Sequence, residues 1–438
     1  MSQVKKVAFL LGDIAALYAA LVAMLFLRYG DTILRHEIKV HLAPFSLLFV
    51  VWILTFLILD LYRPKTSRNR STLLTAIFFA SIIAGIISSM MFYLFFGDFF
   101  KLTPKTNLIV FSIAFILIDF WWRIVALKIF SADKQKIVFV GNSPLIGKLT
   151  NYLKYNQHLG YTQIAQISDL SPVNFEMIKK MAAEKKFDML IIQSHLTRDN
   201  TSLKLLYNLL PLEIEFINLL DFHESIFEKT PIEETDESWF IKNINLRRPL
   251  YDNLKRIADV FLSFAIGVIL SPFTILITII IKLTSSGDII YKQERVGKND
   301  KLFTLYKFRT MKNDGGGPLW TEENDKRITA FGTFLRLTHL DEIPQLWNIF
   351  GGDISFTGPR PERTELAKQY CKFPYYEIRH IVKPGLTGWA QINYRSSASL
   401  EEAYEKLKYD IFYIKNRSLF LDSMIILKTI KYIFTKHD

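Results

Sequence analysis

The chain contains a single cysteine, Cys371, among its 438 residues, so no internal disulfide can staple it. Charged residues make up only 22% of the sequence, slightly below the roughly 25% of soluble proteins. Acidic residues are outnumbered by basic ones, 42 against 54, which leaves a formal net charge of +12. Half of the residues are hydrophobic, which excludes a disordered or collagen-like chain. The length allows roughly three domains. The order of apolar and basic segments decides between one mixed domain and a membrane protein with a basic cytoplasmic part.

Four long and almost uncharged runs lie in the first third of the chain, at residues 7–27, 43–59, 73–96 and 108–122. Each is near the roughly 20 apolar residues that a helix needs to cross a membrane, the last only if it extends beyond Trp122. A soluble helical bundle would place polar residues at every third or fourth position, and these runs do not. The first run is also too long for a removable signal peptide. We therefore expect residues 1–130 to form a bundle of four transmembrane helices.

Basic residues are unevenly distributed over the short loops between these runs, with nine on one side of the expected membrane and five on the other. Because loops rich in Lys and Arg stay in the cytoplasm, we expect the N-terminus and everything after residue 130 to face the cytoplasm. Asp13 and Asp119 lie inside the runs. Asp119 and Arg123 stand four residues apart on one helix face, so we favour a structural ion pair over a functional intramembrane acid.

Residues 131–245 alternate short strand-like runs with helical stretches, a pattern typical of a parallel sheet with crossover helices. We therefore predict a Rossmann-like α/β module. A dinucleotide-binding loop needs closely spaced glycines, but after Gly141 the second glycine is replaced by Ser143, which Pro144 follows. This favours a structural or regulatory module over a nucleotide-binding one. The expected strands are residues 136–141, 162–167, 189–193 and 213–219.

A fifth apolar run, residues 260–281, contains 22 residues without a charge. Its length predicts another membrane span, but basic residues flank both ends, whereas a spanning helix usually has one basic end. Ser271 and Pro272 lie at its midpoint, where proline removes a backbone donor and kinks a helix. We therefore expect a re-entrant helix over about 257–282 that bends at Pro272 and returns. An ordinary proline-kinked span is the alternative.

The remaining chain is polar, basic and rich in motif-like clusters. Asp341 and Glu342 stand at an expected helix start, where Thr338 can act as the cap and Pro344 is tolerated in the first turn. A carboxylate pair with arginines nearby can hold Mg²⁺ together with a phosphate, and an aspartate can attack phosphorus. An isolated Asp-Glu pair is more often a solvated helix start. Here the pair stands among four further clusters, at residues 293–298, 306–311, 352–362 and 383–391.

In this order the clusters resemble the bacterial sugar transferase family, the monotopic polyprenyl-phosphate phosphoglycosyl transferases, from about residue 250 to the end. The four apolar runs and the α/β module resemble the long-form members by architecture. The resemblance implies a mixed, mainly helical catalytic domain over residues 246–438 in a protein of the bacterial inner membrane, with its soluble domains in the cytoplasm. It also implies the first step of exopolysaccharide, capsule or O-antigen synthesis, with the sugar left open.

The family's reaction, carried over to this chain, makes Asp341 the nucleophile that attacks a UDP-sugar, releases UMP and forms a phosphosugar–aspartyl intermediate. Undecaprenyl phosphate then accepts the phosphosugar. Glu342 is the partner acid, and the resemblance implies that Asp341 and Glu342 hold Mg²⁺. Ser271 and Pro272 match the break in the family's re-entrant helix. The positions that match phosphate handling and the nucleotide pocket are Lys307, Arg309, Arg336, Pro359, Arg360 and Pro361.

Two other functions remain open from the sequence. A membrane-bound nucleotide-sugar dehydratase would need a Tyr-x-x-x-Lys pair, a spacing that occurs twice, at Tyr251/Lys255 and Tyr404/Lys408. It would also need a glycine-rich loop after a strand ahead of that pair, and no such loop precedes either pair. A membrane scaffold or regulator of polysaccharide assembly is compatible with residues 1–245. The basic residues bracket the fifth apolar run, which suits membrane lipids and a phosphorylated lipid rather than nucleic acid. A homodimer is compatible with the sequence.

Overall fold

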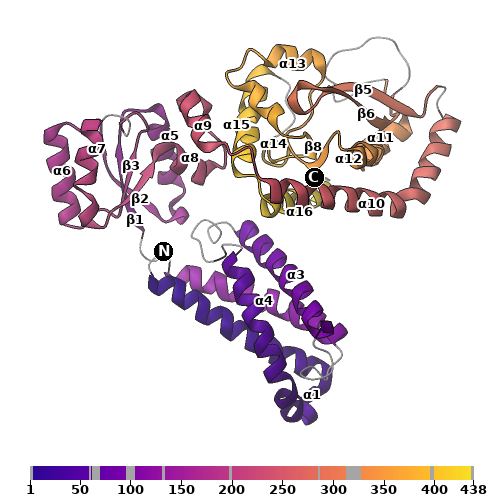
Figure 1. Cartoon of the computed structure of the whole chain (residues 1–438), viewed down its shortest axis with the longest axis horizontal. Coiled ribbons are helices and arrows are strands. Elements are labelled where there is room, and N and C mark those ends of the chain that lie inside the picture. The colour runs from indigo at the N-terminus through magenta and orange to yellow at the C-terminus, as the bar shows by residue number, and fades with distance from the viewer. Residues whose placement is uncertain are drawn as a thin grey trace. The chain divides into compact units, whose positions relative to one another are not determined.

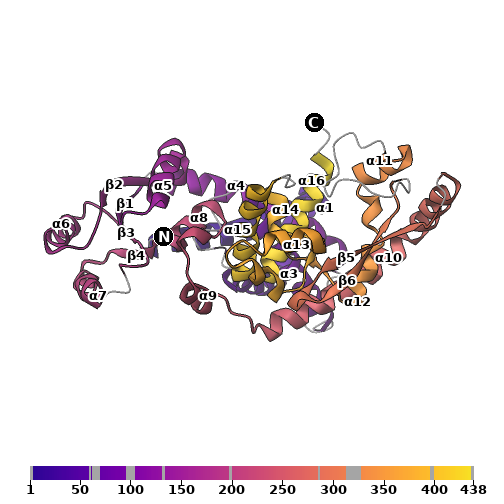
Figure 2. The same cartoon turned by 90° about the horizontal axis from the view of Figure 1, so that it is seen from above.

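The computed structural model describes residues 3–58, 61, 70–94, 104–130, 134–196, 200–284, 287–311, 327–394 and 399–435. The chain forms two compact units, Met1–Ser225 and Ile226–Asp438 (Figures 1 and 2).

Apolar helices make up the first part of the first unit. Gly30, with φ 69° and ψ −179°, divides the longest of them, α1, into two segments at a conformation that glycine adopts without steric cost. Three segments are long and apolar enough to cross a membrane, Val7–Gly30, Glu37–Leu57 and Thr106–Ala126, and Ile77–Met91 is a shorter apolar stretch. These coincide with the four expected runs, although residues 59, 95 and 96 lie outside the described part of the chain. The helices are α1 (Gln3–Ile58), α3 (Arg70–Leu94) and α4 (Pro104–Phe130).

Helix α4 contacts both α1 and α3. Aromatic side chains pack where these helices meet. The Trp52 ring lies edge-on to Phe111 and Phe115, with centroid distances of 5.3 and 4.9 Å. Such T-shaped pairs add to the gain from burial. The Trp52 indole N–H donates to Ser88 Oγ across 3.2 Å, so its polar group is satisfied inside the bundle.

A buried ion cluster also joins α1 to α4. Arg123 Nε donates to Asp119 Oδ2 across 3.0 Å, which confirms the expected pair. The guanidinium also contacts Asp13 from α1, and its Nη1 donates to the carbonyl oxygen of Leu61 across 3.1 Å. All three charged side chains are at most 1% exposed. Arg123 is therefore the counterion of two buried carboxylates from different helices.

We predict that Arg123→Leu destabilises the first unit, because it leaves Asp13 and Asp119 buried without their counterion. Removing one partner of a buried ion pair typically costs about 3–5 kcal/mol. The expected result is a lower thermal unfolding midpoint of the detergent-solubilised protein, with Arg123→Lys intermediate because lysine lacks the forked guanidinium. A wild-type midpoint in Arg123→Leu would contradict this role.

The rest of the first unit is built around a four-stranded parallel sheet in the order β2-β1-β3-β4. The expected parallel sheet is therefore confirmed. Valines, isoleucines and leucines of the inner strands, such as Val138 and Leu190, pack against Phe175 and Ile178 of a covering helix. The elements are β1 (Gln135–Val140), α5 (Pro144–Tyr155), β2 (Tyr161–Ile167), α6 (Pro172–Ala183), β3 (Met189–Ile192), α7 (Asn200–Tyr207), β4 (Glu215–Asn218) and α8 (Leu219–Phe227).

The loop after β1 is closed by the module's own side chains. Gln193 Oε1 accepts the backbone N–H of Asn142 across 3.0 Å, and it lies 2.5 Å from the position that a Cβ would take on Gly141. The Ser143 hydroxyl oxygen accepts the N–H of Leu145 and caps α5. Gly141, with φ 135°, therefore serves close packing against Gln193.

The second unit combines the long helix α10 with short strands and helices. An antiparallel hairpin, β5–β6, and a parallel pair, β7–β8, are joined by short helices. The elements are α9 (Glu237–Asn243), α10 (Pro249–Thr284), β5 (Ile290–Val296), β6 (Leu302–Phe308), α11 (Ala330–Leu337), α12 (Gln345–Gly351), β7 (Ser355–Thr357), α13 (Thr364–Tyr370), β8 (Gly385–Thr387), α14 (Trp389–Asn393), α15 (Leu400–Asn416) and α16 (Leu419–Thr435). The 3₁₀ helices of this unit include η5 (Leu340–Glu342) and η6 (Tyr376–Ile381).

Helix α10 is apolar enough to cross a membrane, and most of its surface is exposed. It begins at Pro249, earlier than the expected residue 257, and it contains Pro272. Its ribbon runs along the unit and turns away near its C-terminal end (Figures 1 and 2). The Ser271 hydroxyl donates to the Val268 carbonyl across 2.8 Å, so its polar group is satisfied within the helix next to the proline.

The first turns of α10 are fastened to the rest of the second unit. Lys255 Nζ donates to the carbonyl oxygen of Thr357 across 2.9 Å and lies 2.8 Å from Asp422 Oδ2. Arg256 donates to the carbonyl oxygens of Ile349 and Phe350 at the end of α12. The polar beginning of α10 therefore anchors the apolar remainder.

Candidate active site

The two candidate carboxylates lie in the 3₁₀ turn η5, immediately before α12. His339, with φ 54°, turns the chain into η5, and its carbonyl oxygen accepts the N–H of Glu342 across 3.2 Å. Thr338 is not the cap that the sequence suggested, because its hydroxyl donates back to the carbonyl oxygen of Phe334 and closes α11. Asp341 is 8% exposed and Glu342 is half-buried. The turn therefore presents two adjacent carboxylates at the edge of the unit's interior.

Two basic side chains from other elements reach this pair. Lys307, near the end of β6, places Nζ 2.6 Å from Glu342 Oε1 and 3.9 Å from Asp341 Oδ2. Arg360, in the turn after β7, places Nη2 3.9 Å from Glu342 Oε1. The structure therefore brings together four predicted site residues from three separate segments.

The pKa values of the two carboxylates move in opposite directions. Burial raises the pKa of Asp341 above its usual range, against the opposing effect of Lys307. Burial also acts to raise the pKa of Glu342, but the charges of Lys307 and Arg360 outweigh it and hold the pKa at about 2. Adjacent carboxylates with separated pKa values are typical of sites that use them in different roles.

The structure places the other predicted residues in contacts of their own. Arg336, on α11, donates through Nε to Thr310 Oγ1 across 2.9 Å, and its charge opposes the rise that burial causes in the pKa of Asp341. Arg309 follows β6, and its guanidinium lies against Gly287. Pro359 and Pro361 flank Arg360 and offer their carbonyl oxygens to neighbouring segments.

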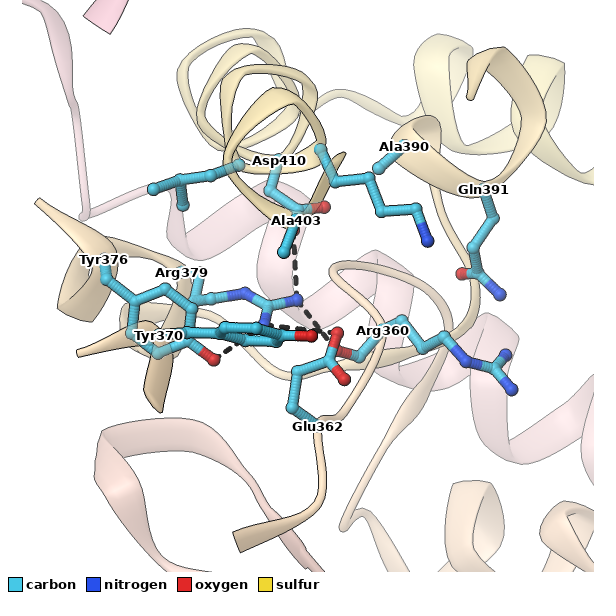
Figure 3. A pocket seen from close by; sticks show the side chains of 11 residues that line it. Arg360, Glu362, Tyr370, Tyr376, Arg379, Ala390, Gln391, Ala403 and Asp410 are labelled. Atoms are coloured by element: carbon cyan, nitrogen blue, oxygen red, sulfur yellow. Dashed lines mark hydrogen bonds and ion pairs between the residues drawn. The ribbon is translucent and has the colours of Figure 1, made fainter. Parts of the chain in front are cut away.

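A small polar pocket adjoins Arg360 (Figure 3). Sequence analysis assigned no role to most of the residues that line it, because they come from scattered segments. Arg379 lies on η6, between two of the motif clusters, and nothing in its spacing marks it. The pocket is lined by Arg360, Glu362, Tyr370, Tyr376, Arg379, Ala390, Gln391, Ala403, Lys406, Leu407 and Asp410.

The centre of this pocket wall is the buried guanidinium of Arg379. Its Nη2 lies 3.0 Å from Asp410 Oδ2, and its Nη1 donates to Tyr376 Oη across 2.9 Å. Glu362 Oε1 lies 3.5 Å away. Burial raises the pKa of Asp410 to about 6, although the charge of Arg379 opposes the rise.

The carboxylate pair limits the kind of metal ion that the site can hold. Among the described residues, no group of three or more His, Cys, Asp and Glu side chains is placed to bind a metal. Asp341 and Glu342 alone offer two carboxylates. Mg²⁺ usually binds through one or two carboxylates together with substrate phosphates. The donor set therefore fits a Mg²⁺ ion shared with a phosphate, and not a self-contained metal site.

The second unit also matches known proteins. The model of the bacterial sugar transferase family matches residues 250–436, which contain every predicted site residue. The exopolysaccharide production protein PSS of Rhizobium leguminosarum bv. phaseoli is 37% identical over 186 residues, which are 40% of this chain and 93% of the relative.

Two longer relatives match over the same part of the chain. The UDP-N-acetylgalactosamine-undecaprenyl-phosphate N-acetylgalactosaminephosphotransferase of Aeromonas hydrophila is 38% identical over 193 residues, 43% of this chain and 46% of the relative. The UDP-glucose:undecaprenyl-phosphate glucose-1-phosphate transferase of Escherichia coli (strain K12) is 38% identical over 195 residues, 42% of each protein. The chain thus matches less than half the length of these two relatives.

We predict that Asp410 makes the stability of the second unit depend on pH. Because its folded pKa, about 6, exceeds the ordinary value of 3.8, the folded protein binds this proton more tightly than the unfolded chain does. The resulting stability is fully present below the ordinary pKa and is lost as pH rises through about 6. In thermal scans of the solubilised proteins, we compare the unfolding temperature of wild type with that of Asp410→Asn at two pH values. The difference, wild type minus variant, should be smaller at pH 7.5 than at pH 4.5. An equal difference at both pH values would contradict the assignment.

Proposed function

Because the chain belongs to the bacterial sugar transferase family, we propose that it transfers a sugar 1-phosphate from a UDP-sugar to undecaprenyl phosphate. The products are UMP and a polyprenyl-diphosphate sugar, and the reaction begins the synthesis of an exopolysaccharide, capsule or O-antigen. The observation that carries the proposal is the buried Asp341–Glu342 pair with Lys307 and Arg360 beside it, inside the region that the family model matches.

The proposed reaction has two steps at one phosphorus atom. An Asp341 carboxylate oxygen attacks the sugar-linked phosphorus, and the bridging P–O bond breaks so that UMP leaves. An oxygen of undecaprenyl phosphate then attacks the same phosphorus and releases Asp341. Both steps therefore use one nucleophile supplied by the protein, Asp341, and one binding place for the transferred group.

The neighbouring side chains have distinct roles in this proposal. Lys307 and Arg360 offset the negative charge of the diphosphate, and Glu342, ionised at neutral pH, holds Lys307 in place. Arg309 and Arg336 extend the positive charge, and Arg336 already acts on Asp341. Asp341 and Glu342 would hold Mg²⁺, which supplies further positive charge to the diphosphate when bound.

We also propose the finer architecture. Residues 1–130 form a four-helix transmembrane bundle, 131–245 a Rossmann-like module and 246–438 the catalytic domain. Helix α10 enters the membrane, bends at Pro272 and returns, which keeps the soluble parts on the cytoplasmic side of the inner membrane. Support comes from the apolar and largely exposed α10, its internal proline and the parallel sheet. A homodimer belongs to the same proposal.

We predict that membranes containing the protein release UMP from a UDP-hexose when undecaprenyl phosphate and Mg²⁺ are supplied. A panel of UDP-sugars identifies the donor, and chelation of Mg²⁺ should abolish the release. Asp341→Asn should lower turnover at least about a thousandfold, because the amide cannot serve as the nucleophile. Glu401→Gln, an exposed position in the first turn of α15, is the matched control and should leave turnover unchanged. Full turnover in Asp341→Asn would exclude the covalent mechanism.

The sole cysteine, Cys371, is exposed and tests the proposed orientation. A membrane-impermeant maleimide should leave it unlabelled in intact spheroplasts and label it after permeabilisation. Because a spanning α10 would carry Cys371 to the other side, labelling in intact spheroplasts would support the fully spanning helix instead.

A further inference from the structure

The turn that carries Arg360 is held by its backbone carbonyl oxygens. Gly385 N–H donates to the carbonyl of Pro359 across 2.9 Å, and the N–H of Val296 donates to that of Glu362 across 3.1 Å. Arg295 Nη1 donates to the carbonyl of Pro361 across 3.0 Å. These three bonds come from β5 and β8, on either side of the turn.

The carbonyl oxygen of Arg360 itself is bound by a buried guanidinium. Arg379 Nη2 donates to it across 2.9 Å, and Arg379 is 6% exposed. With this bond, four consecutive carbonyl groups from residue 359 to 362 have partners outside the turn. A backbone held at every carbonyl has little freedom to rotate.

Arg379 is in turn fixed from several directions. Asp410 on α15 and Tyr376 on η6 bind its two terminal nitrogens, and Glu362 adds a second negative charge. Figure 3 shows the side chain of Arg360 extending away from Arg379, so the two guanidinium groups lie on opposite sides of the Arg360 backbone. That side chain is the one that approaches Glu342.

We propose that Arg379 is a positioning residue for the transfer reaction: it clamps the Arg360 carbonyl and so aims the Arg360 guanidinium at the Asp341–Glu342 pair. This inference rests on the proposed function for its effect on turnover, but the clamp itself does not. Only a guanidinium offers two separate nitrogens that bind a carbonyl, a carboxylate and a phenol together. Arg379→Lys therefore keeps the positive charge and loses the clamp.

A double-substitution cycle separates positioning from a merely structural role. Arg379→Lys should lower kcat/KM about tenfold, and Arg360→Ala should lower it further. If Arg379 acts through Arg360, the double variant is no worse than Arg360→Ala alone, because groups that act as one unit are strongly non-additive. Losses that multiply would overturn the inference.

Arg248→Lys is the matched control. Arg248 also binds backbone carbonyl groups in the second unit, those of Lys415 and Arg417. These two residues lie at the end of α15 and just after it, far from the Arg360 turn in the sequence. Its effect, if any, should multiply with that of Arg360→Ala, as expected for independent sites.

Hydrogen–deuterium exchange tests the clamp without reference to turnover. In the full-length solubilised protein, Arg379→Lys should speed exchange in peptides covering residues 355–363, and Arg248→Lys should not. Unchanged exchange in Arg379→Lys overturns the clamp. If wild type releases no UMP but Arg379→Lys loosens this turn, the proposed function fails while the clamp stands.

Discussion

The ion pair between Lys255 and Asp422 is the constraint on which the second unit depends, because it fastens an apolar helix to a polar active-site framework. Lys255 lies in the first turns of α10; its side chain is 15% exposed and that of Asp422 is 9% exposed. A buried charge is tolerated only when paired and hydrogen-bonded, and Lys255 meets this through Thr357, Tyr413 and Asp422. Since Thr357 ends β7, the strand that leads into the Arg360 turn, the position of the apolar helix α10 and that of the turn are set together.

Pairing with a basic side chain also explains why the two adjacent carboxylates have different pKa values. Asp341 and Glu342 are adjacent in sequence, so without other groups each would raise the pKa of the other. Lys307 breaks this symmetry, because its ammonium lies 2.6 Å from Glu342 and 3.9 Å from Asp341. Against the effect of burial, Lys307 and Arg360 keep Glu342 ionised, whereas burial keeps the pKa of Asp341 raised and its oxygens more basic.

The parts that sequence analysis predicted well are those in which one local pattern decides. The apolar runs gave the helices, and strand-like runs separated by helical ones predicted the parallel sheet. The first turns of α10 were missed. Lys255 and Arg256 give residues 249–256 the composition of a polar segment that flanks a helix, although these residues belong to the helix itself. The prediction that Thr338 caps the helix start at Asp341 and Glu342 was wrong. Thr338 lies at the end of α11, and its hydroxyl donates to the Phe334 carbonyl oxygen instead.

Arg379 was missed for a different reason, since two of the partners that define its role, Arg360 and Asp410, lie 19 and 31 residues away in the sequence and share no period with it. Motif clusters locate groups that meet a substrate, whereas a group that holds backbone carbonyls leaves no comparable pattern.

The spacing of charges has one more consequence for the proposed reaction. A carboxylate oxygen that accepts a direct hydrogen bond from an ammonium is a weaker nucleophile, because that bond already holds part of its negative charge. Lys307 makes its short bond to Glu342 and reaches Asp341 only through its field, so it stabilises the Asp341 charge without blocking its oxygen. Glu342 thus acts on the proposed nucleophile indirectly, because its ion pair with Lys307 keeps the ammonium group from bonding directly to Asp341. This division of labour gives a physical reason for two acidic residues where the covalent chemistry needs only one.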